Sequence, residues 1–188
     1  MVVLNRIYTR TGDDGTSALA TGERRQKSDL RFSAIGTIDE TNATIGLARL
    51  HREALGQIDG MLAAAQNDLF DLGADLATPE KAGGRERLRI TATQVEHLEG
   101  NIDSLNARLQ PLTSFVLPGG TPSAAALHFA RTVARRAERL IVELAAREVV
   151  NPEAVHYINR LSDFLFVAAR AVNDSGAADV LWIPGKNR

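Results

Sequence analysis

The chain has 188 residues, no cysteine and a formal net charge of −1 at pH 7. A chain of this length fits one compact domain, residues 1–188, and the missing thiols exclude disulfides, a cysteine nucleophile and a thiolate metal site. The balanced charge and the few aromatic residues argue against a nucleic-acid partner, and no apolar run is long enough to span a bilayer. No signal peptide opens the chain, so we expect a cytoplasmic domain with neither a nucleic-acid nor a membrane partner.

The first 27 residues lack a helical pattern. Residues 2–8 have the composition of a short extended piece, and residues 9–17 contain three threonines, two glycines, two aspartates and one serine. Such a segment offers backbone N–H groups and hydroxyls to phosphate oxygens or to a hydrated cation. The Walker pattern GxxxxGK[ST] is absent, so the loop alone is weak evidence, and a plain surface turn is the usual alternative. Residues 22–27 form a second polar loop.

A first helix is predicted from a cap at Ser28 or Asp29 to about Leu50. Its apolar positions are Ile35, Ile38, Ile45 and Leu47. A second stripe combines the small residues Gly36, Ala43 and Gly46 with Asp39, and would let another helix approach closely. An acid in such a contact requires a partner, which the arginines of a later helix could supply. The alternative is an ordinary exposed aspartate.

Two further helices are predicted over residues 57–77 and 91–111, separated by a polar linker, residues 81–89. Their apolar residues recur at core spacing, and we assign them packing and no chemistry. The predicted core positions are Ile58, Met61, Leu62, Ala65, Leu69, Leu72 and Leu76 in the first, and Val95, Leu98, Ile102, Leu105 and Leu109 in the second.

The fourth predicted helix, residues 121–147, begins with Thr121 as N-cap and Pro122 at the first helical position. Its core stripe is Leu127, Ala130, Ala134, Ala137, Ile141 and Leu144. The neighbouring stripe is His128, Arg131, Arg135, Glu138 and Arg139. These basic groups border the core face and do not point directly away from it, which favours a bound anion such as a polyphosphate or carboxylate. The alternative is a surface helix with ion pairs such as that of Arg135 with Glu138.

A fifth helix is predicted from a cap at Asn151 to about Asp174. Its core stripe is Ile158, Leu161, Leu165, Ala169 and Val172, and a second stripe holds His156, Asn159, Asp163, Phe166 and Arg170. The tail, residues 180–185, begins with apolar residues and should dock onto the bundle. Five helices after a polar N-terminal loop, with almost no strand signal, predict an all-α bundle.

Six motifs then occur in an order and spacing that identify a family. They are YTRTGDDGTS at 8–17, GERRQKSD at 22–29, AIGTIDETNATIG at 34–46, FVLPGG at 115–120, LHFARTVARRAER at 127–139 and YINRLSDFLFVAAR at 157–170. Together they cover nearly the whole chain, which resembles the propanediol-utilisation (PduO) type of ATP:cob(I)alamin adenosyltransferase. The resemblance implies a five-helix bundle with an N-terminal phosphate-binding loop, assembled as a homotrimer with ATP held between adjacent subunits.

The resemblance also implies site residues. The phosphate-binding loop would be Thr9, Arg10, Thr11 and Gly12, with Ser17 and Ala18 at its far end and Lys27 contacting phosphate. Nucleotide binding would involve Arg135, Arg136, Ala137, Glu138, Arg139 and Asn159. Arg131 and Asp39 would form a pair that joins subunits at the site, Asp163 would be an acid important for activity, and Phe115 would line the corrinoid side and crowd out the lower cobalt ligand.

The activity that the resemblance implies is transfer of the 5′-deoxyadenosyl group of ATP to Co(I) of a corrinoid, with release of triphosphate. ATP, Mg²⁺ and cobalamin are the implied ligands, with a reductase and an adenosylcobalamin-dependent enzyme as further partners and no metal ligand assigned among the side chains. The cobalt is the nucleophile, which agrees with a chain that has no cysteine. The alternatives are a non-catalytic ATP-sensing or cobalamin-carrying bundle and a purely structural scaffold.

Overall fold

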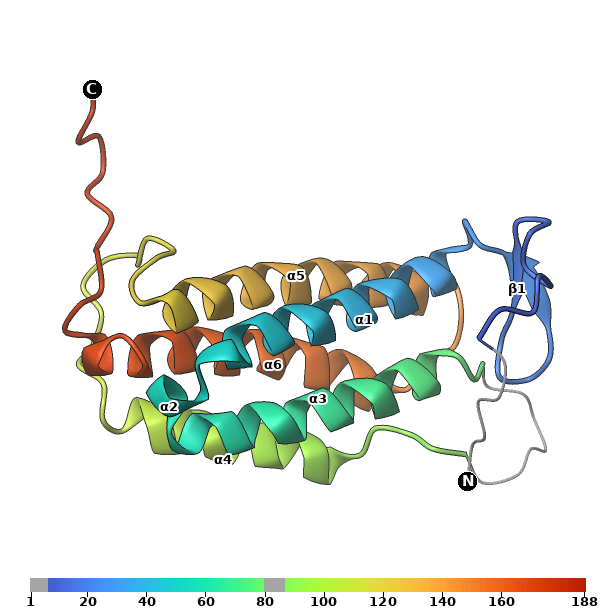
Figure 1. Ribbon diagram of the computed structural model, residues 1–188, viewed down its shortest axis with the longest axis horizontal. Helices are drawn as coiled ribbons and strands as arrows, with labels where there is room; N and C mark the ends of the chain where they lie inside the picture. Colours follow the sequence, from blue (N-terminus) through green and yellow to red (C-terminus); the bar gives the residue numbers. More distant parts are fainter. Residues whose placement is uncertain (1–6, 80–86) are drawn as a thin grey trace.

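A computed structural model describes residues 7–79 and 87–188, and shows an elongated bundle of long helices lying side by side (Figure 1). The predicted residues 2–6 of the extended piece and residues 81–86 of the linker lie outside this description. The five long helices of the described chain confirm the predicted all-α fold. They are α1 (Leu30–Ala48), α3 (Gln57–Leu76), α4 (Ala92–Asn106), α5 (Pro122–Ala145) and α6 (Pro152–Ala171).

The predicted caps start the two helices that carry most of the candidate site. At α5, the Thr121 hydroxyl accepts from the backbone N–H of Ala124 at 3.1 Å, with proline at the first helical position. At α6, the Asn151 side chain accepts from the N–H of Glu153 at 3.1 Å. The Asn151 amide also donates to the buried carboxylate of Asp75, so this cap ties α6 to the end of α3.

The core lies between these helices where the apolar periodicity placed it. Every residue of the predicted α5 core stripe is buried, as are all but Val172 of the α6 stripe. In the helices predicted to serve packing alone, Met61, Ile102 and Leu109 are only partly buried against this core. No helix among residues 7–79 and 87–188 is both long enough and apolar enough to cross a membrane.

The structure differs from the sequence prediction at the ends of two helices. The first helix stops at Ala48 and continues as a 3₁₀ turn, η1 (Arg49–His51), and the short α2 (Arg52–Leu55). Leu47 is therefore 52% exposed near a helix end and is not the core residue that we predicted. The third predicted helix, α4, ends at Asn106 and not at Pro111. Backbone hydrogen bonds from the N–H groups of Arg108 and Leu109 form turns after it.

A β-hairpin that the sequence did not predict sits beyond the N-terminal end of α1 (Figure 1). Its strands are β1 (Thr16–Ala18) and β2 (Arg24–Gln26), paired antiparallel so that Ser17 faces Arg25. The turn between them closes with a hydrogen bond from the Gly22 N–H to the Leu19 carbonyl, with Gly22 at φ 82°. Leu19, between the two strands, is buried and gives the hairpin a small apolar contact with the bundle.

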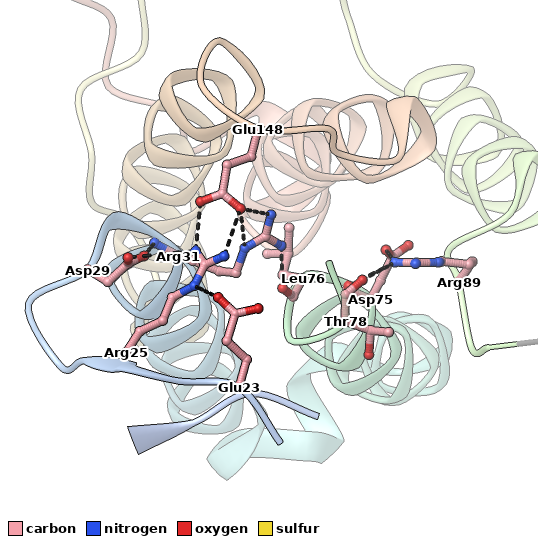
Figure 2. Close-up of polar contacts among 9 residues, drawn as sticks. All are labelled: Glu23, Arg25, Asp29, Arg31, Asp75, Leu76, Thr78, Arg89 and Glu148. Atoms are coloured by element: carbon pink, nitrogen blue, oxygen red, sulfur yellow. Dashed lines mark hydrogen bonds and ion pairs between the residues drawn. The ribbon is translucent and has the colours of Figure 1, made fainter. Parts of the chain in front are cut away.

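A shared carboxylate fastens the hairpin to the bundle (Figure 2). Glu148, just after α5, accepts from Arg25 of β2 at 2.7 Å and from Arg31 of α1 at 2.8 Å. Arg31 is 2% exposed and also donates to the Leu76 carbonyl at the end of α3, at 2.6 Å. A buried guanidinium needs such partners, so one acid holds the hairpin, α1 and the end of α5 in register.

The opposite end of the bundle carries the loop between α4 and α5 and the C-terminal tail (Figure 1). The tail pairs with this loop, because the Leu117 N–H donates to the Val180 carbonyl at 2.8 Å and the Trp182 N–H donates to the Phe115 carbonyl at 2.7 Å. The prediction that the tail docks onto the helical bundle was wrong. The tail pairs with the loop between α4 and α5, and its apolar residues stay largely exposed.

Replacing Glu148 tests this fastening. The two arginines lower the pKa of Glu148, Arg25 more than Arg31, so the ion pairs stabilise the fold above the ordinary pKa of glutamate and this stabilisation is lost as the pH falls through the lowered value. We expect Glu148→Gln to reduce the free energy of unfolding at pH 7 by about 1–3 kcal/mol. The difference from the wild type should shrink in acid. Urea unfolding of both proteins at pH 7 and in acid, at one protein concentration, measures this difference in the free energy of unfolding. A difference that does not change with pH would contradict the charge argument.

Candidate functional site

The N-terminal loop is folded back on itself by Lys27. The Lys27 ammonium donates to the Gly12 carbonyl at 2.7 Å, and its backbone N–H donates to the Gly15 carbonyl at 2.8 Å. A Cβ at Gly12 would lie 3.0 Å from the Lys27 nitrogen, so the close approach favours glycine. The structure thus brings the predicted phosphate-contacting lysine onto the predicted loop. Thr9, Arg10 and Thr11 are exposed beside it, while Ser17 and Ala18 belong to β1.

Arg24 organises the same loop, and sequence reasoning gave it no role. Its guanidinium donates to the Thr11 carbonyl and to the Thr16 hydroxyl. The Thr16 hydroxyl and N–H donate to Asp14 at 2.7 and 2.9 Å, and these bonds lower the pKa of Asp14. The signal that could have found Arg24 is its place on a strand facing the loop, which requires the hairpin to be known first.

The basic flank of α5 meets a polar stripe of α6. The Asn159 amide donates to the Glu138 carboxylate at 2.8 Å, and Asn159 in turn accepts from Arg160 at 2.9 Å. Glu138 therefore faces Asn159, and no ion pair with Arg135 forms among the described residues, contrary to the simple surface-helix alternative. Arg135 and Arg139 are exposed, and the Arg139 guanidinium also donates to the Arg135 carbonyl at 3.1 Å, so both can still present donors to an anion.

Two other residues of the predicted nucleotide segment have partners within the chain. Arg136 forms an ion pair with Glu40 of α1. Ala137 is fully buried in the core, so its side chain does not line the basic surface and serves the packing role that its periodicity assigned. Asp163 is exposed one helical turn beyond Asn159.

Arg131 and His128 lie deeper along the same flank. The Arg131 guanidinium is 6.0 Å from the Phe166 ring, and the His128 ring meets Phe166 edge-on at 6.1 Å. Nε of Arg131 and Nδ1 of His128 are buried without a hydrogen-bond partner in the described chain. Burial and the neighbouring Arg135 lower the pKa of Arg131. A buried donor without a partner requires an explanation, and this one makes Arg131 a candidate for contact with a ligand, a water molecule or another chain.

An apolar cavity of about 630 Å³ opens next to Arg131. Phe115 and Trp182 form one side, with ring centroids 6.0 Å apart, and Phe166 forms another. Phe115 is 77% exposed and lies next to exposed Trp182, and a contiguous apolar patch of this kind marks a candidate ligand or protein contact. The volume of the cavity, and a mostly apolar lining that includes one cation, suit a large, flat, apolar cofactor.

One expected contact does not form within the chain. Asp39 was expected to meet the arginines of α5, but it is exposed, and no ion pair or hydrogen bond of its carboxylate occurs among the described residues. Its neighbour Glu40 takes Arg136 instead. The hairpin and the aromatic cavity also lie at opposite ends of the bundle, so one chain does not bring the predicted phosphate loop and Phe115 together (Figure 1).

These features define a class of protein: a helical bundle with a hydroxyl-rich loop, a basic helix flank and an apolar cavity. The sequence profile of the cobalamin adenosyltransferase family matches residues 7–172. The chain belongs to this family. The match confirms the family that the six motifs predicted and favours an adenosyltransferase over the non-catalytic alternatives.

Individual relatives agree with this assignment. The chain is 49% identical over 193 residues to a corrinoid adenosyltransferase of Mycobacterium tuberculosis, covering 100% of this chain and 97% of that protein. It is 45% identical over 177 residues to the corrinoid adenosyltransferase PduO of Salmonella typhimurium, covering 91% of this chain and 50% of that protein. A variant PduO-type ATP:corrinoid adenosyltransferase from Lactobacillus reuteri, solved with cobalamin and ATP, superimposes with a TM-score of 0.86 at 37% identity, covering 94% of this chain and 99% of that one.

The surroundings of His128 predict an unusual titration. Burial lowers the pKa of His128, and the charge of Arg131 lowers it further, while Asp179 acts in the opposite sense. We expect His128 to stay neutral to a lower pH than an ordinary histidine. Histidine NMR titration measures this, with assignment by a His128→Gln variant and a histidine in a short unstructured peptide as the reference. A His128 that titrates with the peptide histidine would contradict the burial argument.

Proposed function

We propose that the protein transfers the 5′-deoxyadenosyl group of ATP to Co(I) of a corrinoid such as cob(I)alamin and releases triphosphate. The observation that carries the proposal is that exposed Arg135 lies on the same flank as the Glu138–Asn159 pair and as Arg131, whose Nε has no hydrogen-bond partner in the described chain. Family membership and relatives solved with cobalamin and ATP support it. Incubating the protein with ATP, Mg²⁺ and chemically reduced cobalamin, then measuring the Co–C bond and triphosphate, tests it.

The phosphate tail of ATP is assigned to the basic groups and to the loop. Arg135 and Arg139 offer planar donors to phosphate oxygens. Lys27 holds the loop at Gly12, and the exposed Thr9 and Thr11 hydroxyls, which are hydrogen-bonded to each other, lie beside it. As cobalt attacks C5′, the C–O bond breaks and its electrons pass to the triphosphate. Cations placed where that charge grows stabilise the transition state. The Glu138–Asn159 pair is positioned to bind the nucleoside and to fix its orientation.

Mg²⁺ is assigned to the phosphates and not to a side-chain cluster. In residues 7–79 and 87–188, no three His, Asp or Glu side chains gather as a metal-binding group. The hydroxyls of Thr9 and Thr11 are 2.9 Å apart and exposed, and hard oxygen donors of this kind suit a hydrated Mg²⁺ carried by triphosphate. The ion would supply positive charge to the leaving group.

The corrinoid is assigned to the apolar cavity between Phe115, Trp182 and Phe166. Its aromatic walls would exclude water from a strongly reducing metal, and Phe115 would occupy the side of the ring where a lower ligand otherwise binds. Arg131 lies at the border of this cavity and the basic flank. We also assign Asp163 as an acid needed for activity, because it follows Asn159 by one turn on the same face of α6.

The complete site is assigned to the contact between adjacent subunits of a homotrimer. Within one chain the phosphate loop and the aromatic cavity lie at opposite ends, whereas Arg131 has an unused donor and Asp39 an exposed carboxylate. A contact that pairs Asp39 of one subunit with Arg131 of the next would satisfy both charges. The small residues Gly36 and Ala43 beside Asp39 would permit the close approach, and both are exposed.

Arg135→Ala tests the phosphate clamp. We expect turnover to fall about 10²–10³-fold, because a donor aimed at the developing charge is lost, with little change in thermal stability because the side chain is exposed. Arg147→Ala is the matched control, since Arg147 is an exposed arginine just beyond α5 that pairs with Glu143 in the last turn of the helix. Wild-type turnover by a folded Arg135→Ala protein would remove the clamp role.

Mixing two inactive variants tests the shared site. Thr11→Val impairs the loop and Asn159→Ala impairs the helix flank, so a site that draws them from different chains regains an intact pair in about a quarter of interfaces after random exchange. Activity should then reappear on mixing. Subunit exchange is verified by mass spectrometry of tagged chains. Proven exchange without any recovered activity would assign both residues to one chain.

A further inference from the structure

A buried ion pair lies at the end of the bundle that carries the aromatic cavity. Arg170, in the last turn of α6, donates to the Asp179 carboxylate at 2.7 Å. The two side chains are 6% and 4% exposed. Neither residue belongs to the phosphate loop, the basic flank or the lining of the cavity, so the proposed chemistry leaves them without a role.

The pair is connected to both ends of the loop between α4 and α5. Arg170 also donates to the Gln110 carbonyl at 2.9 Å, where that loop begins. The other Asp179 oxygen accepts from Asn173 at 2.9 Å, and Asn173 accepts from the Thr121 N–H at 3.2 Å, where the loop ends. A single cluster of three side chains therefore fixes the start of the loop, the end of the loop and the root of the tail.

The closeness of this packing is visible at Gly120. Its φ of 96° lies in the region that favours glycine, and a Cβ there would come within 2.3 Å of the Asn173 oxygen. The backbone of the loop thus runs directly against the Asn173 amide. Small movements of the cluster would be transmitted to the loop, because no flexible side chain separates them.

The walls of the cavity depend on the cluster of Arg170, Asp179 and Asn173. Beyond this cluster, the loop and the tail are joined by the backbone hydrogen bonds Trp182–Phe115 and Leu117–Val180. The Ser114 hydroxyl also donates to the Trp182 carbonyl at 2.7 Å. Phe115 is 77% and Trp182 45% exposed, so packing alone holds them weakly. A two-stranded ribbon of this size is marginal in water without an anchor.

We propose that Arg170, Asp179 and Asn173 are positioning residues that set Phe115 and Trp182 in place before the corrinoid arrives. The inference deepens the proposed function and rests on it. A buried ion pair is a poor source of net stability, because desolvation offsets its attraction, but it fixes geometry. A preformed wall lowers the ordering cost of binding a large apolar ligand. The cluster should therefore affect corrinoid binding far more than ATP binding.

Asp179→Asn tests the role, with Asp174→Asn as the matched control because Asp174 is an exposed aspartate in the same turn region. Trp182 is the single tryptophan of the chain, so its fluorescence reports on the wall directly. In Asp179→Asn we expect a red-shifted emission and stronger acrylamide quenching. We also expect the KM for reduced cobalamin to rise about tenfold because the wall must then order on binding, while ATP affinity stays within about twofold. The control should match the wild type in all three.

Arg170→Lys is the second variant, and it carries the test if Asp179→Asn does not fold. Lysine keeps the charge beside Asp179 but lacks the fork that reaches both Asp179 and Gln110. The same changes in smaller measure support the proposal. Unaltered fluorescence and cobalamin KM in a folded variant overturn it, and so do equal losses of ATP and cobalamin binding, which indicate a general fold effect. Absence of adenosylation by the wild type would instead overturn the proposed function, while Trp182 fluorescence would still report whether the cluster holds the wall.

Discussion

The structure depends on one carboxylate shared by two arginines. Arg31 is enclosed where α1, α3 and α5 meet, and a guanidinium in that position must be neutralised. Glu148 neutralises it and, with its other oxygen, holds Arg25 of the hairpin (Figure 2). Because the same acid serves the core and the hairpin, the loop proposed to bind phosphate is tied to the bundle through an interaction that the fold itself requires.

The α5 helix connects this anchor to the candidate site. Its small core residues, mainly alanines, allow α1 and α6 to pack closely, so polar groups one position away lie at the edge of the contact and not far out in solvent. Arg131 consequently has a buried nitrogen, whereas Arg135, one turn later, is exposed. This difference in exposure separates Arg135, at the proposed phosphate site, from Arg131, which lines the apolar cavity.

The sequence predicted the helices and core well because those follow from local periodicity and capping. Thr121 and Asn151 start their helices as expected, and Ala137 is buried as its spacing indicated. The hairpin was missed because its strands have three residues each, too few to show an alternating pattern. The Glu148 and Asp179 networks were missed because each joins residues far apart in the chain, and nothing in the local composition of either segment signals the other.

The candidate site was predictable only in part, and the reason is physical. The motifs and their spacing identified Lys27, Glu138 and Asn159, and the structure gives each of them a defined contact. The Asp39 carboxylate has no hydrogen bond or ion pair within residues 7–79 and 87–188, and its expected partner Arg131 retains an unused donor there. If a neighbouring subunit supplies the missing half, the charges become satisfied only when the site is assembled. An isolated chain would then hold an exposed acid and a half-buried cation at a cost, so the features that prepare the site for ATP would also favour association.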